Sequence, residues 1–139
     1  MLSPLMDFHK MKIVSNENTS LDLEKINLSR PLEVNELVVV SHCIAYEKGF
    51  WEDADDAEKD EKRYNNMLGN KLMLITSEIS ECQDAIRSGE PSDKVVEELA
   101  DAVIRICDLV GYLGLDLETA LIKKTEKNKT RPRKHGKKF

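Results

Sequence analysis

Aromatic residues and long apolar runs are both scarce in this sequence of 139 residues. Phe, Trp and Tyr make up 5% of the chain, which argues against a β-sandwich built on aromatic and β-branched strands. The longest apolar run, Leu37 to Val40, is far shorter than the roughly 20 residues needed to cross a bilayer. The first residues also lack the apolar core of a signal peptide. We therefore expect a cytoplasmic, helix-rich protein with no membrane partner.

Cysteine is also scarce. Cys43, Cys82 and Cys107 are odd in number, widely spaced and set among apolar neighbours. Neither a disulfide framework nor a CxxC metal site fits this arrangement, so buried and reduced thiols are expected. Met67 and Met73 are expected to fill the core as well.

Charge, in contrast, is plentiful and unevenly distributed. The chain carries 21 Lys and Arg against 26 Asp and Glu, a net charge of −5. Residues 123–139 alone carry +8, which leaves −13 on residues 1–122. The sequence therefore predicts an acidic body with a basic tail, and its length suits one domain.

The pattern of polar and apolar residues predicts an all-α domain over residues 29–139, preceded by an N-terminal extension, residues 1–28, with no assigned function. Four helices are expected, over residues 31–48, 71–87, 92–112 and 117–127. Their short connections are typical of a four-helix bundle.

Local signals place the ends of these helices. The polar segment between Gly49 and Asn70 is expected to be a loop or a short solvated helix. Gly111 and Gly114 are the expected stop signals of the third helix, and Ser92 and Asp116 are the expected N-caps of the third and fourth.

Helical-wheel positions predict which faces of the two middle helices are buried. In the helix at 71–87 the expected core residues are Ile75, Ile79, Cys82 and Ile86. In the helix at 92–112 they are Val95, Leu99, Val103, Ile106 and Val110. Glu78 and Glu81 share a mixed stripe, which predicts partial burial. Glu98 and Asp101 fall beside Arg105 and Asp108, on a face that solvation alone would explain.

Each of these acid pairs has i, i+3 spacing, so its two carboxylates can converge on one point. Carboxylates about 4 Å apart repel by about 4 kcal/mol at an effective dielectric near 20, so a cluster must take up protons or bind cations. Mg²⁺ is the natural candidate because it prefers hard oxygen ligands, with Mn²⁺ as a possible substitute. Solvated helix faces are the alternative interpretation.

The order of these motifs resembles a known family. Glu78-Ile-Ser-Glu81 followed by Glu98-Leu-Ala-Asp101 is similar to the ExxE then ExxD signature of the MazG-like, all-α nucleoside triphosphate pyrophosphohydrolases. The resemblance includes the segments 47–51 and 70–75 and a terminal N-x-x-R-P-x-K-H-G-K pattern that ends at Lys137. It covers roughly residues 33–137.

The resemblance implies Mg²⁺-dependent cleavage of a (deoxy)nucleoside triphosphate to the monophosphate and pyrophosphate, as in house-cleaning of the nucleotide pool. It carries Glu78, Glu81, Glu98 and Asp101 over as metal ligands. The catalytic base stays unassigned, because Glu78, Glu81 and Glu98 all have the required chemistry. A homodimer, or a tetramer made of dimers, is also implied, and it would complete the core of the bundle.

Substrate contacts are expected in the matching part of the tail, at Lys124, Asn128, Arg131, Lys134 and His135. Cationic groups there would bind phosphate, and Arg131 could do so bidentately. A solvated tail is the alternative interpretation. Trp51, the single tryptophan, is expected either to stack on a nucleobase or to pack in the core. His42 is expected to be a packed, hydrogen-bonded residue and stays outside the predicted site.

Two alternatives remain open. One is a dUTP or dCTP diphosphatase with a narrow pocket, since base preference cannot be read from this sequence; a phosphoribosyl-ATP pyrophosphohydrolase fits the motifs less well. The other is a non-catalytic helical module whose basic tail binds nucleic acid through phosphate contacts. The acidic body argues against a broad nucleic-acid surface, so nucleic acid is not the expected partner.

Overall fold

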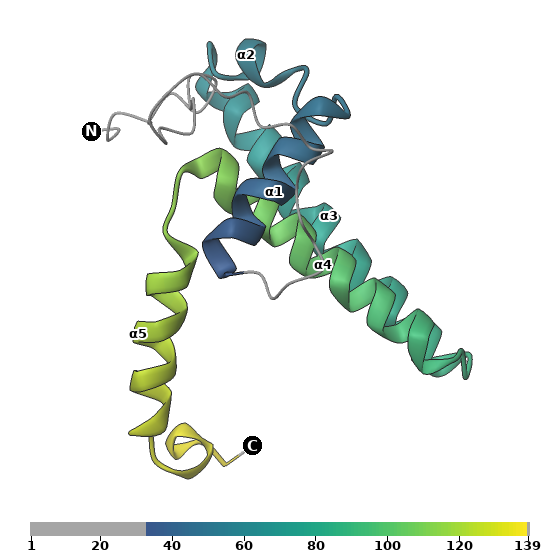
Figure 1. The fold of residues 1–139 in the computed structure, drawn as a ribbon, viewed down its shortest axis with the longest axis vertical. Helices are drawn as coiled ribbons and strands as arrows, with labels where there is room; N and C mark the ends of the chain where they lie inside the picture. The colour runs from purple at the N-terminus through teal and green to yellow at the C-terminus, as the bar shows by residue number, and fades with distance from the viewer. Residues whose placement is uncertain (1–32, 139) are drawn as a thin grey trace.

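The computed structural model describes residues 33–138, and this part of the chain forms helices and no strand (Figure 1). The elements are α1 (Val34–Glu47), α2 (Ala54–Ala57), α3 (Glu61–Arg87), α4 (Ser92–Leu113), α5 (Leu117–Lys129) and a final 3₁₀ turn (Arg133–Gly136). The all-α prediction is confirmed. The predicted extension over residues 1–28, and the start of the predicted helix at 31–48, lie outside the described residues.

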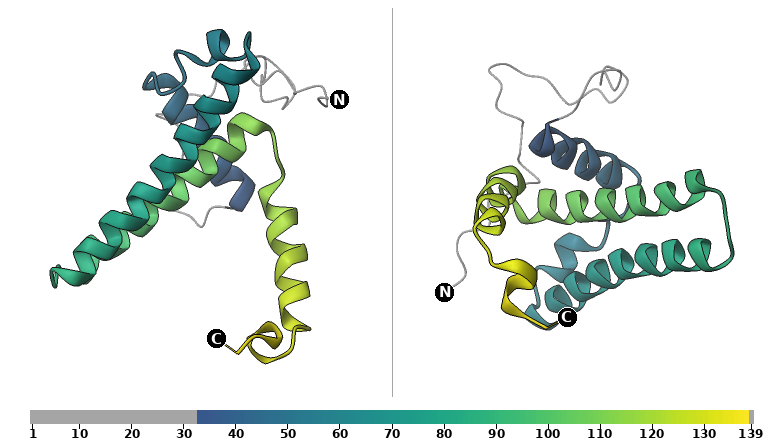
Figure 2. Two further views of the ribbon diagram at one scale, coloured as in Figure 1. Left: turned by 180° about the vertical axis from the view of Figure 1, so that it is seen from behind. Right: turned by 90° about the horizontal axis from the view of Figure 1, so that it is seen from below.

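Within residues 33–138, the helices α1, α3 and α4 pack together. α3 and α4 run side by side as an antiparallel pair, and α1 packs against α4 (Figure 1). Figure 2 shows α4 between α1 and α3 in the view from below. α5 leaves the end of α4 and extends away from this stack. The four-helix bundle is therefore not closed within residues 33–138, and it stays a prediction. No helix in this range is long and apolar enough to cross a membrane.

α3 begins ten residues before the predicted start at Lys71, so the prediction of a loop or a short solvated helix is wrong over residues 61–70. Asp60 caps the helix, because its side chain accepts a hydrogen bond from the backbone N–H of Arg63 at 2.8 Å. Tyr64, Met67 and Leu68 then recur at helical spacing and pack against a small core cluster. Capping and this apolar stripe together extend the helix into a segment whose overall composition is polar.

That cluster consists of Trp51, Ala54, Leu109 and Tyr112. The rings of Trp51 and Tyr112 stack with centroids 4.0 Å apart and an interplanar angle of 12°. The Tyr112 hydroxyl donates a hydrogen bond to Glu58, just after α2. Burial, reinforced by this bond to a carboxylate, raises the pKa of Tyr112. The cluster therefore ties the short α2 segment to the end of α4.

The two glycines near the end of α4 have different roles. Gly114 ends the helix in the left-handed conformation, with φ of 67°, as predicted. Gly111 lies inside the helix, so the prediction that it is a stop signal is wrong. A Cβ at Gly111 would lie 2.6 Å from His42 Cβ and 3.2 Å from the Val38 carbonyl oxygen. The missing side chain is what allows α1 to approach α4 this closely.

The helix starts also differ from each other. Ser92 is the first residue of α4 and Pro91 occupies the N-cap position without a side-chain hydrogen bond, so the predicted Ser92 cap is wrong. Asp116 caps α5 as predicted, accepting from Thr119 N at 3.0 Å. It also accepts from Asn35 Nδ2 at 2.9 Å, which attaches the start of α5 to α1. α5 buries none of its residues.

The predicted core stripes of α3 and α4 are largely wrong. Cys82 is buried, but Ile79 and Ile86 are 51% and 61% exposed. Exposed side chains on α4 include Leu99, Val103 and Ile106. Met73, expected in the core, is also exposed, whereas Cys82 and Cys107 are buried and Cys43 is half-buried.

The surface between α3 and α4 is lined instead by small residues and acids. Ala85 and Ala102 are buried there together with Glu78 and Glu98. Small side chains allow the two helices to pack closely, and the large apolar ones then lie on a face that no element within residues 33–138 covers.

Candidate metal and substrate site

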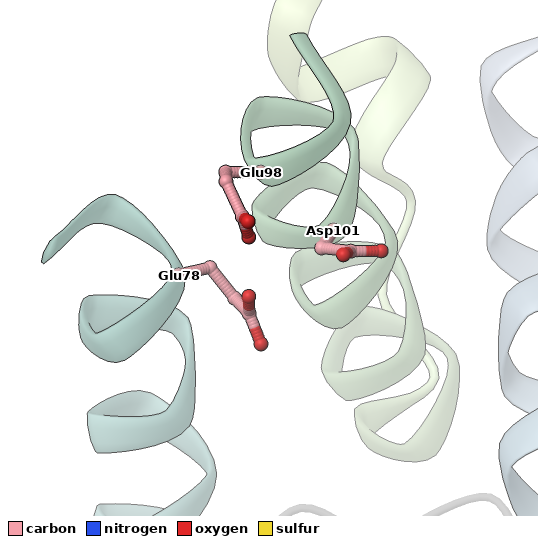
Figure 3. A group of neighbouring side chains, drawn as sticks. All are labelled: Glu78, Glu98 and Asp101. Atoms are coloured by element: carbon pink, nitrogen blue, oxygen red, sulfur yellow. The ribbon is translucent and has the colours of Figure 1, made fainter. Parts of the chain in front are cut away.

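Three of the four predicted metal ligands lie together between α3 and α4. One carboxylate oxygen from each of Glu78, Glu98 and Asp101 lies within 4.8 Å of the others. In Figure 3 the side chain of Glu78 reaches from α3 toward α4, and Glu98 and Asp101 come from successive turns of α4. Glu78 and Glu98 are buried, with exposed fractions of 6% and 4%, and Asp101 is exposed. The i, i+3 pair on α4 therefore converges on a residue of the neighbouring helix.

The fourth predicted ligand, Glu81, lies outside this group. It stands three residues after Glu78 on α3, and its side chain is exposed. The structure thus brings together both acids of the second motif but only one acid of the first. Ligation by Glu81 stays a prediction.

Each buried acid already has a cationic partner. Arg105 Nε donates to Glu78 Oε1, and Lys94 Nζ lies 2.5 Å from Glu98 Oε1. Lys94 also binds Glu97, at 3.3 Å, and these bonds to Glu98 and Glu97 raise the pKa of its ammonium group. Burying a carboxylate without such a partner is strongly unfavourable. The two cations therefore stabilise the burial of negative charge between the helices.

The donor set fits a hard divalent cation. Three carboxylates supply oxygen ligands only, which is the chemistry that Mg²⁺ and Mn²⁺ prefer. The two nearby cations show that this place in the fold requires positive charge. The residues present are therefore suited to hold such an ion.

A pocket of about 470 Å³ opens beside the acidic group, between α1, α3 and α4. Its size is in the range of small-molecule binding sites. Glu78 and Asp101 contribute to its wall, so the pocket and the acidic group share residues. Most of the wall is apolar, formed by Leu37, Val40, Ile44, Ala45, Phe50, Leu74 and Ile104. The polar residues of this wall, besides the two acids, are Ser41, Lys71, Arg105 and Asp108.

Asp108 is fixed in this wall by two aromatic residues. Its Oδ1 accepts a hydrogen bond from Trp51 Nε1 at 2.8 Å and lies 2.9 Å from His42 Nδ1. The ring of His42 also meets the ring of Trp51 edge-on, with centroids 5.6 Å apart. His42 is thus a packed, hydrogen-bonded residue, as expected. The network fixes a carboxylate at the pocket wall.

Lys71 approaches the same wall from α3. Its ammonium donates to the backbone carbonyl of Phe50 at 2.6 Å and lies 3.9 Å from the centroid of the Trp51 ring. Burial lowers the pKa of Lys71, an effect that Asp108 opposes and Arg105 reinforces. Lys71 therefore adds a second positive group, after Arg105, to a pocket wall that also carries three acids.

Trp51 itself lies in the core. It is 3% exposed, its face is stacked on Tyr112, and its N–H group is bonded to Asp108. Of the two interpretations drawn from the sequence, this position favours core packing over stacking on a substrate base. Trp51 then affects the pocket through the residues it fixes.

The predicted substrate residues of the tail lie on α5 and the turn after it, which Figures 1 and 2 show extending from the helix stack. Their polar contacts are local. Arg131 Nη1 lies 3.1 Å from His135 Nδ1, and Lys134 Nζ donates to the Lys138 carbonyl. Lys124 and Asn128 are exposed on α5. Within this chain the structure does not bring these five residues together with the acidic group.

Sequence reasoning missed several residues of the pocket, namely Lys71, Arg105 and Asp108. Arg105 and Asp108 fall on the acid-bearing stripe of the wheel, which was the available signal. Because that stripe was interpreted as a solvated face, the two residues were not assigned to a site. Lys71 falls in the matching segment 70–75, but that match did not predict its role, because its place depends on the backbone of residue 50, which is distant in sequence.

Comparison of the chain with protein-family models, with curated protein sequences and with solved structures found no match in any of the three. The resemblance to the MazG-like family therefore rests on the motifs alone and stays a prediction.

Proposed function

We propose that the chain is a Mg²⁺-dependent pyrophosphohydrolase that converts a (deoxy)nucleoside triphosphate to its monophosphate and pyrophosphate, in house-cleaning of the nucleotide pool. One observation carries this proposal. Glu78, Glu98 and Asp101 converge at the edge of an apolar-walled pocket of about 470 Å³. An apolar pocket beside a cation-binding group matches the two halves of a nucleotide, a flat base and a charged polyphosphate.

The reaction requires little covalent chemistry from the protein. Water attacks the α- or the β-phosphorus, and the bond between that phosphorus and the bridging oxygen breaks, so that the products are the monophosphate and pyrophosphate in either case. Mg²⁺, held by the acidic group, would neutralise phosphate charge and lower the pKa of a bound water. The acidic residues hold the ion, and one of Glu78, Glu81 and Glu98 accepts the proton of the attacking water.

The test is pyrophosphate release from a panel of canonical and modified nucleoside triphosphates, with and without Mg²⁺. We expect release that requires the metal and that is lost in Asp101→Asn. Asp93→Asn is a matched control, because Asp93 is an exposed acid in the first turn of the same helix. A folded parent that releases no pyrophosphate from any member of the panel contradicts the proposal.

Base preference separates the broad enzyme from the narrow alternative, a dUTP or dCTP diphosphatase. Both would use the same carboxylates. The same panel distinguishes them, because a narrow enzyme releases pyrophosphate from one pyrimidine nucleotide at least about tenfold faster than from the others.

We further propose that the active form is a homodimer or a tetramer of dimers. Leu72, Ile79 and Ile86 repeat every seven residues on α3, and they are all exposed. Val96, Leu99, Val103 and Ile106 repeat at three- and four-residue intervals on α4, and they are exposed as well. Such spacing is typical of helices that pack on other helices. Because the basic tail does not reach the acidic group of its own chain, we infer that the tail of a second copy supplies the phosphate contacts of the site.

A second candidate function is non-catalytic. The exposed cations of α5 and the following turn favour a module that binds nucleic acid through phosphate contacts. Salt-dependent binding of an oligonucleotide without turnover would support it. Removal of residues 123–139 would then abolish binding, whereas Asp101→Asn would leave it unchanged.

A further inference from the structure

Arg105 stands at the boundary between the acidic group and the pocket. Its Nε donates to Glu78, a buried member of the acidic group, and its side chain is 35% exposed. The same side chain lines the pocket. Of the residues that line the pocket, Arg105 is thus the cation that is directly paired with one of the three grouped acids.

We propose that Arg105 is a mobile counter-ion with two alternative partners. Before a divalent cation binds, it pairs with Glu78; after binding, its guanidinium turns to the phosphates of the substrate. This inference rests on the proposed function, because it assigns a role to Arg105 at the same site. It makes the binding of cation and polyphosphate interdependent.

Electrostatics supports competition between Arg105 and the cation. A guanidinium and a divalent ion that share Glu78 repel each other, so each weakens the binding of the other. Glu78 is buried, so this repulsion is less screened by water and salt than it would be at the surface. Guanidinium is also the side chain best suited to bidentate binding of phosphate oxygens. Because Arg105 lines the pocket, its guanidinium can contact a ligand bound there.

Lys94 provides an instructive comparison. It pairs with Glu98 as Arg105 pairs with Glu78, but it does not line the pocket, and it is shared with Glu97. It can compete with the cation but has no second partner in the pocket. The two cations therefore have different expected effects on polyphosphate binding.

The test measures Mn²⁺ binding to the full chain by the electron paramagnetic resonance signal of the free ion. Arg105→Gln should bind Mn²⁺ about tenfold more tightly than the parent, because one like charge next to the ion is removed. Arg87→Gln removes the same charge from the exposed end of α3 and should change the affinity less than about twofold. With Mn²⁺ present, Arg105→Gln should bind inorganic tripolyphosphate about tenfold more weakly.

A second measurement uses the unmodified chain and so does not depend on how Arg105→Gln folds. The ¹⁵N resonance of the Arg105 Nε–H group should shift when Mg²⁺ is added, and again when tripolyphosphate follows. If Mg²⁺ binds and this resonance does not move, the inference is overturned. Unchanged or weaker Mn²⁺ binding in Arg105→Gln overturns it too, because it would make Arg105 a fixed support for a metal ligand.

The failure of the inference can be told apart from the failure of the proposed function. Metal binding and pyrophosphate release with no response at Arg105 would remove only the inference. A parent chain that binds neither Mn²⁺ nor tripolyphosphate and releases no pyrophosphate would remove both.

Discussion

The α3–α4 pair has an inner face, where the two helices contact each other, and an outer face exposed to solvent. Acidic side chains are usually exposed and apolar ones usually buried, but here the two faces show the reverse. The inner face buries Glu78 and Glu98, whereas the outer face exposes Ile86 and Val103. Buried charge is tolerated because Arg105 and Lys94 accompany it. Exposed apolar surface has no such compensation within the described chain. Helical-wheel positions therefore show that the two faces of a helix differ in polarity, but they do not show which face another element of the chain will cover.

The strongest test of the inner face compares two neighbouring glutamates on α4. Glu98→Gln should reduce Mg²⁺-dependent pyrophosphate release about 100-fold or more, because a buried ligand of the proposed metal site is lost. Glu97→Gln should retain activity within about twofold, because Glu97 is exposed and lies outside the acidic group. Equal losses in the two variants would show that the burial of Glu98 has no catalytic meaning.

The outer face is tested by placing a charge on it. We expect the parent to have a mass that is a multiple of 15.9 kDa by light scattering, and Val103→Lys to shift it to 15.9 kDa, since a buried unpaired lysine would oppose association. Thr119→Lys, at an exposed position of α5, is the control and should leave the mass unchanged. A parent that is already a monomer at assay concentration contradicts the prediction.

Two glycines allow a covered surface to be compared with an uncovered one: Gly111 faces α1, whereas Gly69 faces open space. Gly111→Ala should lower the free energy of unfolding by about 1–3 kcal/mol, because the new methyl group would clash with His42 and the α1 backbone. Gly69→Ala should raise it by up to about 1 kcal/mol, because no atom lies within 4 Å of a Cβ placed there, in the interior of α3. Urea unfolding of both variants measures the difference. Similar changes would mean that α1 can move away from α4 without loss.

The smallest effect concerns α5, a helix that buries none of its residues. Hydrogen bonds from Asn35 and Thr119 lower the pKa of Asp116 to about 2, from an ordinary value of 3.8. A lowered folded-state pKa means that the contribution of Asp116 to stability is present above about pH 4 and is lost as the pH falls toward 2.

Carbon NMR of the Asp116 carboxyl group in the folded chain should show this titration midpoint near 2, and Asn35→Ala should move it upward. A midpoint at the ordinary value in the unmodified chain would show that the bond from Asn35 does not hold α5 against α1 in solution.

Much of the helical pattern could be predicted from local signals. The end of α3 at Arg87 and the Asp116 cap of α5 follow from residues that act within one turn of themselves. The early start of α3 has one local signal, the Asp60 cap. The packing of Tyr64 and Met67 against the cluster around Trp51 and Tyr112 could not be predicted this way, because that cluster joins distant parts of the sequence. Gly111 was misread for a similar reason, since its role depends on His42 of another helix.

The candidate site was predicted in the same partial way. The i, i+3 spacing placed Glu98 and Asp101 on one face of α4, and the structure brings both to Glu78. Spacing within a helix does not reveal the neighbouring helix, so Glu81 was grouped with Glu78 even though it is exposed. Arg105 has a role only once the two helices pack, because its partner is a residue of α3. Spacing along one helix thus predicted which acids share a face. Only the packing of α3 against α4 determined which of them lie together in the candidate site.

The position of Trp51 gives the protein an optical reporter. It is the single tryptophan of the chain, it is buried, and its N–H group is bonded to Asp108, a residue of the pocket wall. The ammonium of Lys71, another residue of that wall, lies over its ring. A ligand that displaces Lys71 or Asp108 will change the surroundings of the indole, so intrinsic fluorescence can follow the filling of the pocket without any added label.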